Sequence, residues 1–393
     1  MKDKLPKDKL TVLVATGTRA DFNQVLPVIA AMAKSSVLEP KVVATGMHLS
    51  SEFGLTYRMI EAEGVVLADK VEMLLASDTP VAVAKAIGLG TIGFADCYER
   101  LNPDLLMIPG DRFEMLAAAQ AALVRRLPIA HIAGGDVTEG AFDEAIRHSI
   151  TKMSHLHFVS NAAAARRVRQ LGEDAKTVHL VGNPALDLIA RLQLLDRAAF
   201  AEAIGLELRA RNLLVTFHPV TLDAQPSAMP FAELLTALDG LGPETGIIFT
   251  RPNADTFGRV LIGMIDAFVQ GHPNAVAHTS LGQRLYFSAL RHVSAVVGNS
   301  SSGILEAPSF KIPTVNIGDR QRGRERAASV IDVAAQAQAI AGGIKKAFEM
   351  DCGKVVNPYG DGKASERIVT VLETIEDPRR LIMKTFHDLP MLS

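Results

Sequence analysis

Short apolar runs alternate with Ala-rich amphipathic stretches along the first half of the chain. Leu10–Thr16 (LTVLVAT) is apolar on both faces, which is typical of a strand buried inside a parallel sheet. A helix is expected to follow, with Asp21 capping its first turn. Further strands are predicted at residues 41–45, 105–109, 129–132, 156–159 and 178–181, with helices such as 113–126 and 161–171 between them. This order predicts a parallel sheet covered by helices on both faces.

The same alternation restarts in the second half. Residues 186–212 form a charged helical stretch that can bridge two domains. Strands are then predicted at residues 213–217, 247–250, 276–278, 295–297 and 314–317. We therefore expect two doubly wound α/β domains, at residues 1–185 and 186–365. Such sheets bind ligands outside the carboxyl ends of their strands, so the active site is expected in a cleft between two strand-end faces.

Length, composition and charge fit an ordinary enzyme of two domains. The chain has 393 residues, 48% of them hydrophobic and 21% charged, which is too apolar for a disordered protein. A formal net charge of −2 without a long basic run argues against nucleic-acid binding. Two cysteines give neither a disulfide framework nor zinc spacing. The N-terminus lacks the apolar core of a signal peptide, and no apolar run approaches the roughly 20 residues of a membrane span, so we expect a cytoplasmic protein without membrane contact.

One motif suggests a dinucleotide but lies in the wrong context. Residues 88–93 (GLGTIG) satisfy the GxGxxG pattern, which holds a pyrophosphate only between a strand and the start of a helix. The sequences on either side look like the two halves of one helix. We therefore expect these glycines to allow close packing, and we expect no nicotinamide cofactor.

Polar residues suited to acid–base chemistry follow two neighbouring strands of the first domain. Asp111 and Arg112 come directly after the strand at 105–109, although a helix cap with a surface arginine would look the same. The next strand leads into Gly134 and Gly135, which can let backbone approach a ligand. The acid–base candidates after these glycines are Asp136, Glu139, Asp143 and His148.

Two other features of this region have structural explanations. Asp143 and Arg147 stand at i,i+4 and can form an ordinary helix ion pair. His155 and His157 flank the start of a strand on one face, but no third metal ligand is nearby. We expect both histidines to be structural and expect no metal site.

The second domain offers a site for an anion. His218 follows the strand at 213–217, where a structural and a functional role are equally expected. Residues 298–303 (GNSSSG) turn from a strand into a helix, so Ser300 and Ser301 can offer hydroxyl and free N–H groups. Glu306, about one helical turn further on, can reach ribose hydroxyls. Together these residues predict a nucleoside-diphosphate site without a Walker lysine.

Sequence blocks in order from about residue 10 to 330 resemble the hydrolysing UDP-N-acetylglucosamine 2-epimerase family. They are TGTRAD, TGMHLSSEFG, GDRFEML, GGDVTEGAFDEAIRHSITKMSHLHF, VGNPALD, FHPVT and GNSSSGILEAPSFKIPTVNIGDRQRGR, of which RHSITKMSHLHF and GNSSSGI are highly specific. The resemblance implies a GT-B fold of two Rossmann-like domains with the sugar nucleotide between them. It also implies that a C-terminal helical segment, residues 366–393, returns to the first domain.

The resemblance implies an activity as well. The family converts UDP-GlcNAc and water into ManNAc and UDP, for sialic acid or related nonulosonate synthesis, without metal or cofactor. UDP leaves by anti elimination to give a 2-acetamidoglucal, and water then adds syn with inversion at C2. A homodimer or another homo-oligomer is implied too.

The family reaction implies a role for each candidate residue. Elimination needs a base at C2 and groups that stabilise the departing diphosphate, and hydration needs an acid and a positioned water. By resemblance, the residues that bind UDP are Arg19, His218, Asn253, Ser300, Ser301, Glu306 and Arg320. The catalytic candidates are Asp111, Arg112, Asp136, Glu139, Asp143, His148 and His218.

The chain departs from the family pattern at one point. Family members often carry Glu directly before the paired glycines, where this chain has Ala133. The glycines are followed by Asp136, and the loop is one residue longer, with Glu139 gained. We expect another carboxylate to have taken over the missing role.

Three alternatives stay open at this point. The same chemistry could act on UDP-2,4-diacetamido-2,4,6-trideoxyglucose. A GT-B glycosyltransferase would share the fold and the nucleotide site but would need an acceptor. A non-catalytic nucleotide sensor is the third, and Ala133 is its only support.

Overall fold

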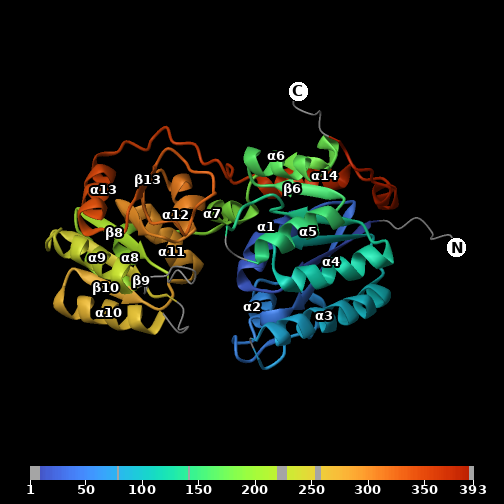
Figure 1. Ribbon diagram of the computed structural model, residues 1–393, viewed down its shortest axis with the longest axis horizontal. Coiled ribbons are helices and arrows are strands. Elements are labelled where there is room, and N and C mark those ends of the chain that lie inside the picture. Colours follow the sequence, from blue (N-terminus) through green and yellow to red (C-terminus); the bar gives the residue numbers. More distant parts are fainter. Residues whose placement is uncertain (1–8, 78, 140–141, 219–227, 253–257, 389–393) are drawn as a thin grey trace. The chain divides into compact units, whose positions relative to one another are not determined.

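The computed structural model describes residues 9–77, 79–139, 142–218, 228–252 and 258–388 of the chain (Figure 1). These residues form two compact units. Unit 1 comprises the described residues up to Leu188 together with those from Tyr359 onward, and unit 2 is Ile189–Pro358. The chain thus leaves unit 1 at 188/189 and re-enters it at 358/359, where the sequence predicted boundaries at 185/186 and 365/366.

Unit 1 is built on a seven-stranded sheet in the order β3-β2-β1-β4-β5-β6-β7, and all neighbouring strands run parallel. The strands are β1 (Leu10–Thr16), β2 (Leu38–Thr45), β3 (Leu67–Val71), β4 (Leu105–Pro109), β5 (Ile129–Ile132), β6 (Leu156–Val159) and β7 (Val178–Leu180). The helices are α1 (Arg19–Met32), α2 (Tyr57–Ala62), α3 (Pro80–Leu101), α4 (Phe113–Arg125), α5 (Asp143–Met153), α6 (Ala162–Gln170) and α14 (Ala364–Glu373). The short 3-10 helices are η1 (Gly46–Leu49), η2 (Ala175–Thr177), η3 (Pro184–Leu186) and η5 (Pro378–Ile382).

Helices cover both faces of this sheet, because alternate residues of a central strand point to opposite sides. On β1, Leu13 and Ala15 join the core under α3 and α4, whereas Val12 and Val14 join the core under α1 and α14. Figure 1 shows α14, in red, among the elements of unit 1, and it packs against α1. The first turn of α1 is capped by Thr18 rather than by Asp21, since the Thr18 side chain accepts from the backbone N–H of Asp21.

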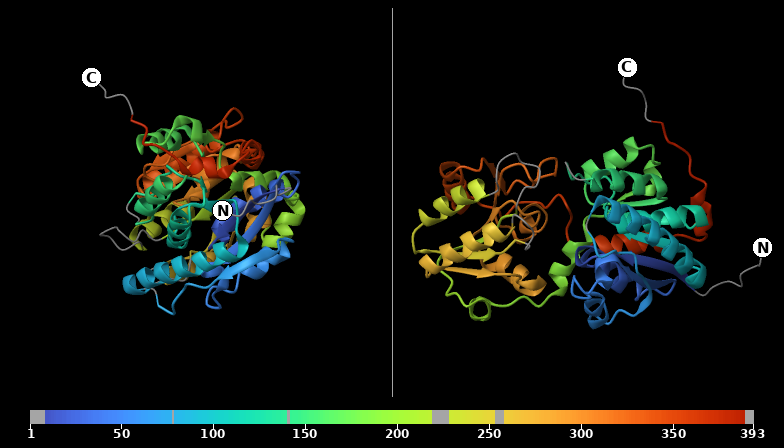
Figure 2. Two further views of the ribbon diagram at one scale, coloured as in Figure 1. Left: turned by 90° about the vertical axis from the view of Figure 1, so that its right-hand side faces the viewer. Right: turned by 60° about the horizontal axis from the view of Figure 1, so that its bottom comes forward.

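Unit 2 repeats the architecture with a six-stranded parallel sheet in the order β10-β9-β8-β11-β12-β13 (Figure 2). The strands are β8 (Arg211–Thr216), β9 (Thr245–Thr250), β10 (Ala275–His278), β11 (Ala295–Gly298), β12 (Thr314–Ile317) and β13 (Val330–Val333). The helices are α8 (Arg197–Ile204), α9 (Ala228–Asp239), α10 (Gly258–Gly271), α11 (Gly282–His292), α12 (Ser302–Leu305), η4 (Ala307–Phe310) and α13 (Ala337–Glu349). The charged stretch 186–212 is not one helix but two short ones, α7 (Asp187–Arg191) and α8, before β8 begins.

The two sheets confirm the predicted pair of doubly wound domains, and each has one switch point. The strand order reverses between β1 and β4 in unit 1 and between β8 and β11 in unit 2. Loops leave such a point toward opposite faces of the sheet, and the crevice between them is where α/β sheets bind ligands. The residues that follow these four strands are 17–19, 110–112, 217–218 and 299–301. Six of the thirteen candidate residues lie in these segments: Arg19, Asp111, Arg112, His218, Ser300 and Ser301.

The glycine pattern that looks like a dinucleotide-binding motif lies in helix α3. Residues 88–93 lie in the interior of this helix, as expected. A Cβ on Gly90 would lie 2.9 Å from the Cβ of Ala117 in α4, and a Cβ on Gly93 would lie 2.7 Å from Cγ1 of Val71 in β3. The glycines therefore allow α3 to pack closely on its neighbours and form no pyrophosphate loop.

The same helix bears on the expectation that no segment spans a membrane. Among the described residues, one helix is long and apolar enough to span a bilayer. This is α3, with 22 residues and a mean hydropathy of 1.3 in its most apolar part. Length and composition alone are weak criteria, because core helices meet them too. Phe94, Cys97 and Tyr98 of α3 are fully buried in the core of unit 1.

Candidate functional site

At the switch point of unit 1, Asp111 is held by a buried arginine. The side chain of Arg147, in α5, is 4% exposed and forms an ion pair with Asp111 at the end of β4. Arg147 also donates to the backbone carbonyl of Asp136 at 2.8 Å and to Oγ1 of Thr138 at 2.7 Å. One guanidinium therefore ties the β4–α4 turn, the loop after β5 and helix α5 together.

This arginine extends into a chain of charged groups. Nη1 of Arg147 donates to Oε2 of Glu144 at 2.7 Å, and Oε1 of Glu144 lies 3.3 Å from Nε2 of His148. Asp111 and His148, both catalytic candidates, are thus connected through Arg147 and Glu144. The expected i,i+4 pair of Asp143 with Arg147 is not among the described ion pairs, because Arg147 turns to Asp111 and Glu144 instead.

Arg112 has its own carboxylate partner. Its Nε and Nη2 donate to the two oxygens of Glu114, both at 3.1 Å, and this bidentate geometry fixes the plane of the guanidinium. Burial by itself lowers the pKa of Arg112, but the carboxylates of Glu114, Asp21 and Asp143 outweigh it and raise the pKa. The charge of Asp143, in the first turn of α5, therefore acts on Arg112.

The paired glycines pack closely on their own domain. Gly135 has φ +77°, and a Cβ there would lie 2.4 Å from the carbonyl oxygen of Ala164 in α6. A Cβ on Gly134 would lie 2.9 Å from Nδ1 of His131. Close packing of this loop on its own domain is what requires glycine at both positions.

The two candidate carboxylates of this loop, Asp136 and Glu139, differ in their surroundings. Oδ1 of Asp136 accepts from Oγ of Ser160 at 2.6 Å and from Nδ2 of Asn161 at 3.3 Å, at the junction of β6 and α6. Glu139 is exposed. Ala133, where the family often has Glu, has φ +64°, which non-glycine residues rarely adopt. Asp136 therefore forms hydrogen bonds with other residues of unit 1, whereas Glu139 is the more accessible of the two to solvent.

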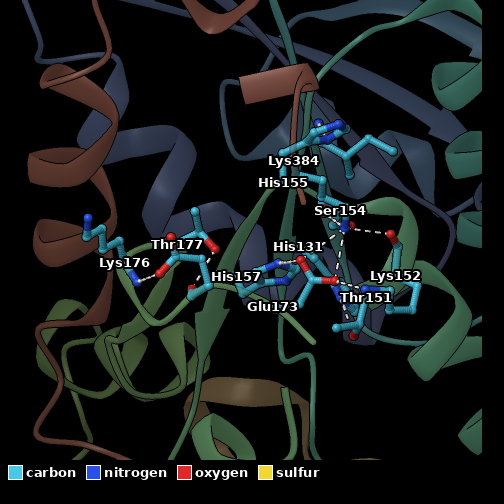
Figure 3. A network of polar contacts seen from close by, with 12 residues as sticks. His131, Thr151, Lys152, Ser154, His155, His157, Glu173, Lys176, Thr177 and Lys384 are labelled. Carbon is cyan, nitrogen blue, oxygen red and sulfur yellow. Dashed lines mark hydrogen bonds and ion pairs between the residues drawn. The ribbon is translucent and has the colours of Figure 1, made fainter. Parts of the chain in front are cut away.

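The histidines of β5 and β6 belong to a buried network that includes the C-terminal segment (Figure 3). Nε2 of His157 donates to Oε2 of Glu173 at 3.0 Å, and Nδ1 of His155 accepts from the backbone N–H of Ile129 at 3.1 Å. Lys384 donates to both oxygens of Glu173 at 3.0 Å. These contacts give both histidines partners within the fold, and they attach the end of the chain to unit 1.

Glu173 is the carboxylate at the centre of this network, and Lys152 and Lys384 are both its ion-pair partners. Burial by itself raises the pKa of Glu173, but hydrogen bonds from His157, Lys152 and Lys384 outweigh it and lower the pKa to about 2. Burial lowers the pKa of His131 and of His155, each to about 4. The histidines are accordingly neutral near pH 7, and the carboxylate of Glu173 is ionised.

In unit 2, Asn299 joins the ends of β8 and β11. The backbone N–H of His218 donates to Oδ1 of Asn299 at 2.7 Å, and Nδ2 of Asn299 donates back to the carbonyl of His218 at 2.8 Å. The carbonyl of Asn299 accepts from Nη1 of Arg320 at 3.1 Å and from Nε2 of Gln321 at 2.9 Å. Two predicted residues, His218 and Arg320, are therefore brought together by an asparagine that the sequence argument passed over.

The serine turn after β11 is tighter than a regular helix start. Gly298 has φ +137°, and a Cβ there would lie 1.9 Å from the carbonyl oxygen of Thr216, so only glycine fits. Ser301 precedes α12, which has only four residues, so the expected support from a helix dipole is small. Ser300, Ser301 and their N–H groups remain the polar groups at this strand end.

Glu306 lies at the end of α12 rather than one turn into a longer helix. Oγ of Ser302 donates to its carboxylate, and the hydroxyl of Tyr286 donates to Oγ of Ser302 at 2.6 Å. Burial raises the pKa of Glu306, partly offset by the hydrogen bond from Ser302. The carboxylate is therefore held in one orientation by a chain of hydroxyl groups.

The remaining predicted residues are accounted for as follows. Arg19, at the start of α1, and Arg320, after β12, are both exposed. Asn253 lies outside the described residues. In the described part of the chain, no group of three or more His, Cys, Asp or Glu side chains could hold a metal ion.

Comparison with known proteins identifies the family. Residues 30–373 match the model of the family described as UDP-N-acetylglucosamine 2-epimerase. The chain belongs to this family. The GT-B class that the sequence predicted for the two units is thereby confirmed, since solved family structures share the fold.

Three relatives of this epimerase-family chain are similar over most of their length. A GDP/UDP-N,N'-diacetylbacillosamine 2-epimerase (hydrolyzing) of Campylobacter jejuni is 38% identical and covers 82% of this chain and 84% of its own. A UDP-N,N'-diacetylbacillosamine 2-epimerase (hydrolyzing) of Legionella pneumophila is 35% identical, with 93% and 96% covered. A UDP-N-acetylglucosamine 2-epimerase of Neisseria meningitidis is 32% identical, with 96% and 99% covered.

Solved structures agree on the fold at low sequence identity. The UDP-GlcNAc 2-epimerase of Neisseria meningitidis bound to UDP-GlcNAc gives a TM-score of 0.74 at 18% identity and covers 93% of this chain and 100% of its own. That of Methanocaldococcus jannaschii gives 0.73 at 16% identity, with 93% and 99% covered.

Proposed function

We propose that this protein is a hydrolysing 2-epimerase of a UDP-linked 2-acetamido sugar. It takes the UDP-sugar and water and releases UDP and the free sugar epimerised at C2. The observation that carries the proposal is the chain Asp111–Arg147–Glu144–His148 at the end of β4, because C2 chemistry needs a base and an acid. Membership of the epimerase family and relatives named as hydrolyzing enzymes support it.

In the proposed first step, a base removes the proton from C2 while the bond from C1 to the UDP oxygen breaks. The electron pair of the C–H bond forms the double bond of the glucal, and UDP departs with the electrons of the C–O bond. Asp111 and Asp143 are the candidate bases. A carboxylate in an ion pair with a guanidinium, as Asp111 is, accepts a proton rather than donating one.

In the proposed second step, water adds across the double bond. Its oxygen bonds to C1 and keeps one hydrogen as the new hydroxyl, its other proton passes to a base of the protein, and an acid of the protein delivers a proton to C2. His148 and the carboxylates of the β5–α5 loop, Asp136 and Glu139, are the candidates for these transfers. One water is consumed and one UDP is released for each turnover.

Unit 2 is proposed to bind the UDP part. Hydroxyl and N–H groups of the turn after β11 suit the diphosphate, and the buried carboxylate at the end of α12 suits the ribose hydroxyls. The proposed UDP ligands are Arg19 from unit 1 and His218, Asn253, Ser300, Ser301, Glu306 and Arg320 from unit 2.

The sugar is proposed to be one of two. The sequence pattern led to UDP-GlcNAc, with UDP-2,4-diacetamido-2,4,6-trideoxyglucose as the alternative. The relatives at 38% and 35% identity are both named for UDP-N,N'-diacetylbacillosamine, which is that diacetamido sugar nucleotide, and they favour the alternative over the relative at 32%.

An acceptor-free assay tests the activity and the choice of sugar. Purified protein is incubated with each UDP-sugar alone, and UDP release and the free sugar are followed by chromatography and NMR. An epimerase releases UDP and the 2-epimer from its preferred sugar. Release of UDP only after an acceptor is added would instead indicate a glycosyltransferase, and binding of UDP without turnover of either sugar would indicate a sensor.

We also propose that the protein is a homo-oligomer, most simply a homodimer. Val81, Leu89 and Ile92 of α3 leave large apolar side chains exposed on one helix, and such groups are costly to leave in water. Light scattering coupled to size exclusion tests this, because a protomer has a mass of 42.1 kDa. A constant mass of one protomer at micromolar concentration would contradict it.

A further inference from the structure

Behind Arg112 lies a pair of buried carboxylates that the catalytic scheme does not use. Asp21, in the first turn of α1, is 5% exposed, and Glu114, in the first turn of α4, is 0% exposed. Strands β1 and β4 are parallel neighbours, so these two helix starts meet at the switch point of unit 1. Two acidic groups buried together call for a reason, because burying charge is unfavourable.

Glu114 occupies one edge of the Arg112 guanidinium. The bidentate contact uses Nε and Nη2, and none of the hydrogen bonds among the described residues uses Nη1. Arg112 is 33% exposed, whereas Glu114 is completely enclosed. The guanidinium is thus held from the inside, and its remaining donors are available to a ligand from the outside.

Asp21 connects this arginine to a second one. Its Oδ2 accepts from the backbone N–H of Gly17 at 3.2 Å, which closes the turn that leads into Arg19. Its charge also acts on Arg112, whose pKa it helps to raise. One carboxylate therefore supports both arginine-bearing turns, β1–α1 and β4–α4.

The backbone around the pair makes room for it. Gly46, after β2, has φ +55°, and a Cβ there would lie 2.7 Å from Cγ and 2.8 Å from Oε1 of Glu114. A Cβ on Gly17 would lie 3.4 Å from Oδ2 of Asp21 and 3.3 Å from Cβ of Glu114. The ends of β1 and β2 thus leave just enough space for two carboxylates.

From these contacts we infer that Asp21 and Glu114 are positioning residues, which hold the guanidinium of Arg112 ready for the anionic part of the substrate. The inference rests on the proposed function. Glu114 orients the guanidinium directly. Asp21 fixes the turn beside it and adjusts the net charge behind it.

The charge of Asp21 changes near neutral pH. Burial and the nearby Glu114 raise the pKa of Asp21 to about 6, against the opposing effect of Arg112. Arg19 on its own helix and His48 on the neighbouring η1 are further charged or titratable groups of these turns. When Asp21 loses its proton, the cluster gains a negative charge, so an anionic substrate is bound less tightly above this pH than below it.

The direct test is a set of isosteric variants of the parent enzyme, assayed with its preferred UDP-sugar. Glu114→Gln keeps the shape but weakens the hold on the guanidinium, so kcat/KM should fall at least about tenfold, mainly through KM. Asp187→Asn is the matched control. Like Asp21, Asp187 is a carboxylate of unit 1 that is 5% exposed. Its oxygens, however, accept from the backbone N–H groups of Ala364 and Ser365 in α14. This control should lower the melting temperature without raising KM.

A double-mutant cycle separates positioning from a general structural role. If Glu114 acts through Arg112, then Glu114→Gln should cost less than about threefold in kcat/KM once Arg112→Lys is already present. A full tenfold loss in that background would overturn the inference. So would a kcat/KM of Glu114→Gln within threefold of the parent.

Asp21→Asn gives an independent readout even if Glu114→Gln does not fold. The ratio of the parent KM to the Asp21→Asn KM should rise about threefold or more between about pH 5 and about pH 7.5, because only the parent gains a charge. A ratio that stays flat would refute the role of Asp21. If the parent turned over neither UDP-sugar, the proposed function would fail, and calorimetry of UDP binding to the same variants over the same pH range would still decide the inference.

Discussion

The ion pair with Arg147 holds the side chain of Asp111 in position, so a substitution at Asp111 has to be designed around this contact. Asp111→Asn keeps the side-chain shape but cannot accept a proton, so kcat should fall at least about 100-fold while UDP affinity changes little. Steady-state kinetics and calorimetry measure the two quantities. Arg147 keeps Glu144 as a partner, so the fold should survive, and the melting temperature checks this.

The same substitution at Asp143 is the companion experiment, since the charge of Asp143 acts on Arg112. If both Asn variants turned over substrate like the parent, the proton transfers would have to be assigned to another loop. Glu139→Gln then becomes the informative variant, because Glu139 is exposed in the loop that we expect to be one residue longer than the family pattern.

Glu306 gives a prediction on the nucleotide side. Its carboxylate is held by Ser302 and is proposed to bind the ribose, so Glu306→Ala should weaken UDP by about 1.5–3 kcal/mol. Inorganic diphosphate, which has no ribose, should bind nearly as it does to the parent. Calorimetry with both ligands makes the comparison, and an equal loss for the two would place Glu306 at the diphosphate instead.

At this scale the sequence predicted which single residues stand at strand ends, but not their partners. Asp111, Arg112 and His218 were placed there because each follows a buried strand, as the structure has it. Asn299 was missed because its partners are distant in the sequence. Glu144 was missed because its role depends on the direction of the Arg147 side chain, which the sequence does not reveal. Asn299, for example, meets His218 across 81 positions of the chain.

At the scale of elements, α3 offers a matched pair of glycines. A Cβ on Gly88 would meet nothing within 4 Å, whereas one on Gly90 would press on Ala117 and Met73. Gly88→Ala should therefore stabilise the protein by about 0.5–1 kcal/mol, because alanine suits a helix interior better than glycine. Gly90→Ala should destabilise it by about 1–3 kcal/mol, because the core must shift.

Urea unfolding of the two variants measures both effects. Equal shifts would show that these glycines are ordinary helix positions. If Gly88→Ala abolished activity without changing stability, the interpretation of the motif as a packing feature would be wrong.

The elements themselves were predictable to the extent that their apolar pattern was uniform. Strands β5, β6 and β12 have the predicted bounds, since all their residues are buried. Strand β3 was missed because its residues alternate between half-buried and exposed positions up to the buried Val71, and β13 was missed because only Ile331 is buried. Edge strands carry a weak apolar signal, and only their pairing with a neighbour defines them.

At the scale of the whole molecule, the chain returns to unit 1 and is anchored there by Lys384. Lys384→Met removes a charged donor from Glu173 and from two backbone carbonyls, those of Lys152 and Ser154. The free energy of unfolding should fall by about 1.5–3 kcal/mol near pH 7. Lys176→Met is the control, because it changes an exposed lysine that contacts Asp174 through its backbone N–H.

The pH dependence of this effect has a defined sign. The folded pKa of Glu173, about 2, lies below its ordinary value of 4.5, so its contribution is present above pH 4.5 and is lost as the pH falls through 2. The difference between the parent and Lys384→Met should therefore narrow below pH 4.5. Urea unfolding at several pH values measures it, and a difference that widened in acid would contradict the assignment of Lys384 to Glu173.

The buried histidines also make the fold less stable as the pH falls, but they do so at a higher pH than Glu173. His131 and His155 have folded pKa values of about 4, below the ordinary 6.5, so each stabilises the fold above pH 6.5 and loses this contribution as the pH falls toward 4. As the pH is lowered, the free energy of unfolding of the parent should thus begin to fall below pH 6.5. Protonation of Glu173 adds to this loss only at lower pH.

In the proposed mechanism, UDP leaves by elimination across C1 and C2, and water then adds to the glucal. The decisive measurement is turnover of the preferred UDP-sugar in D₂O, with the free sugar examined by proton NMR and mass spectrometry. Elimination followed by hydration should give a 2-epimer that carries one solvent deuteron at C2, together with one UDP for each sugar released. A product that keeps its original hydrogen at C2, or one released without inversion there, would contradict it.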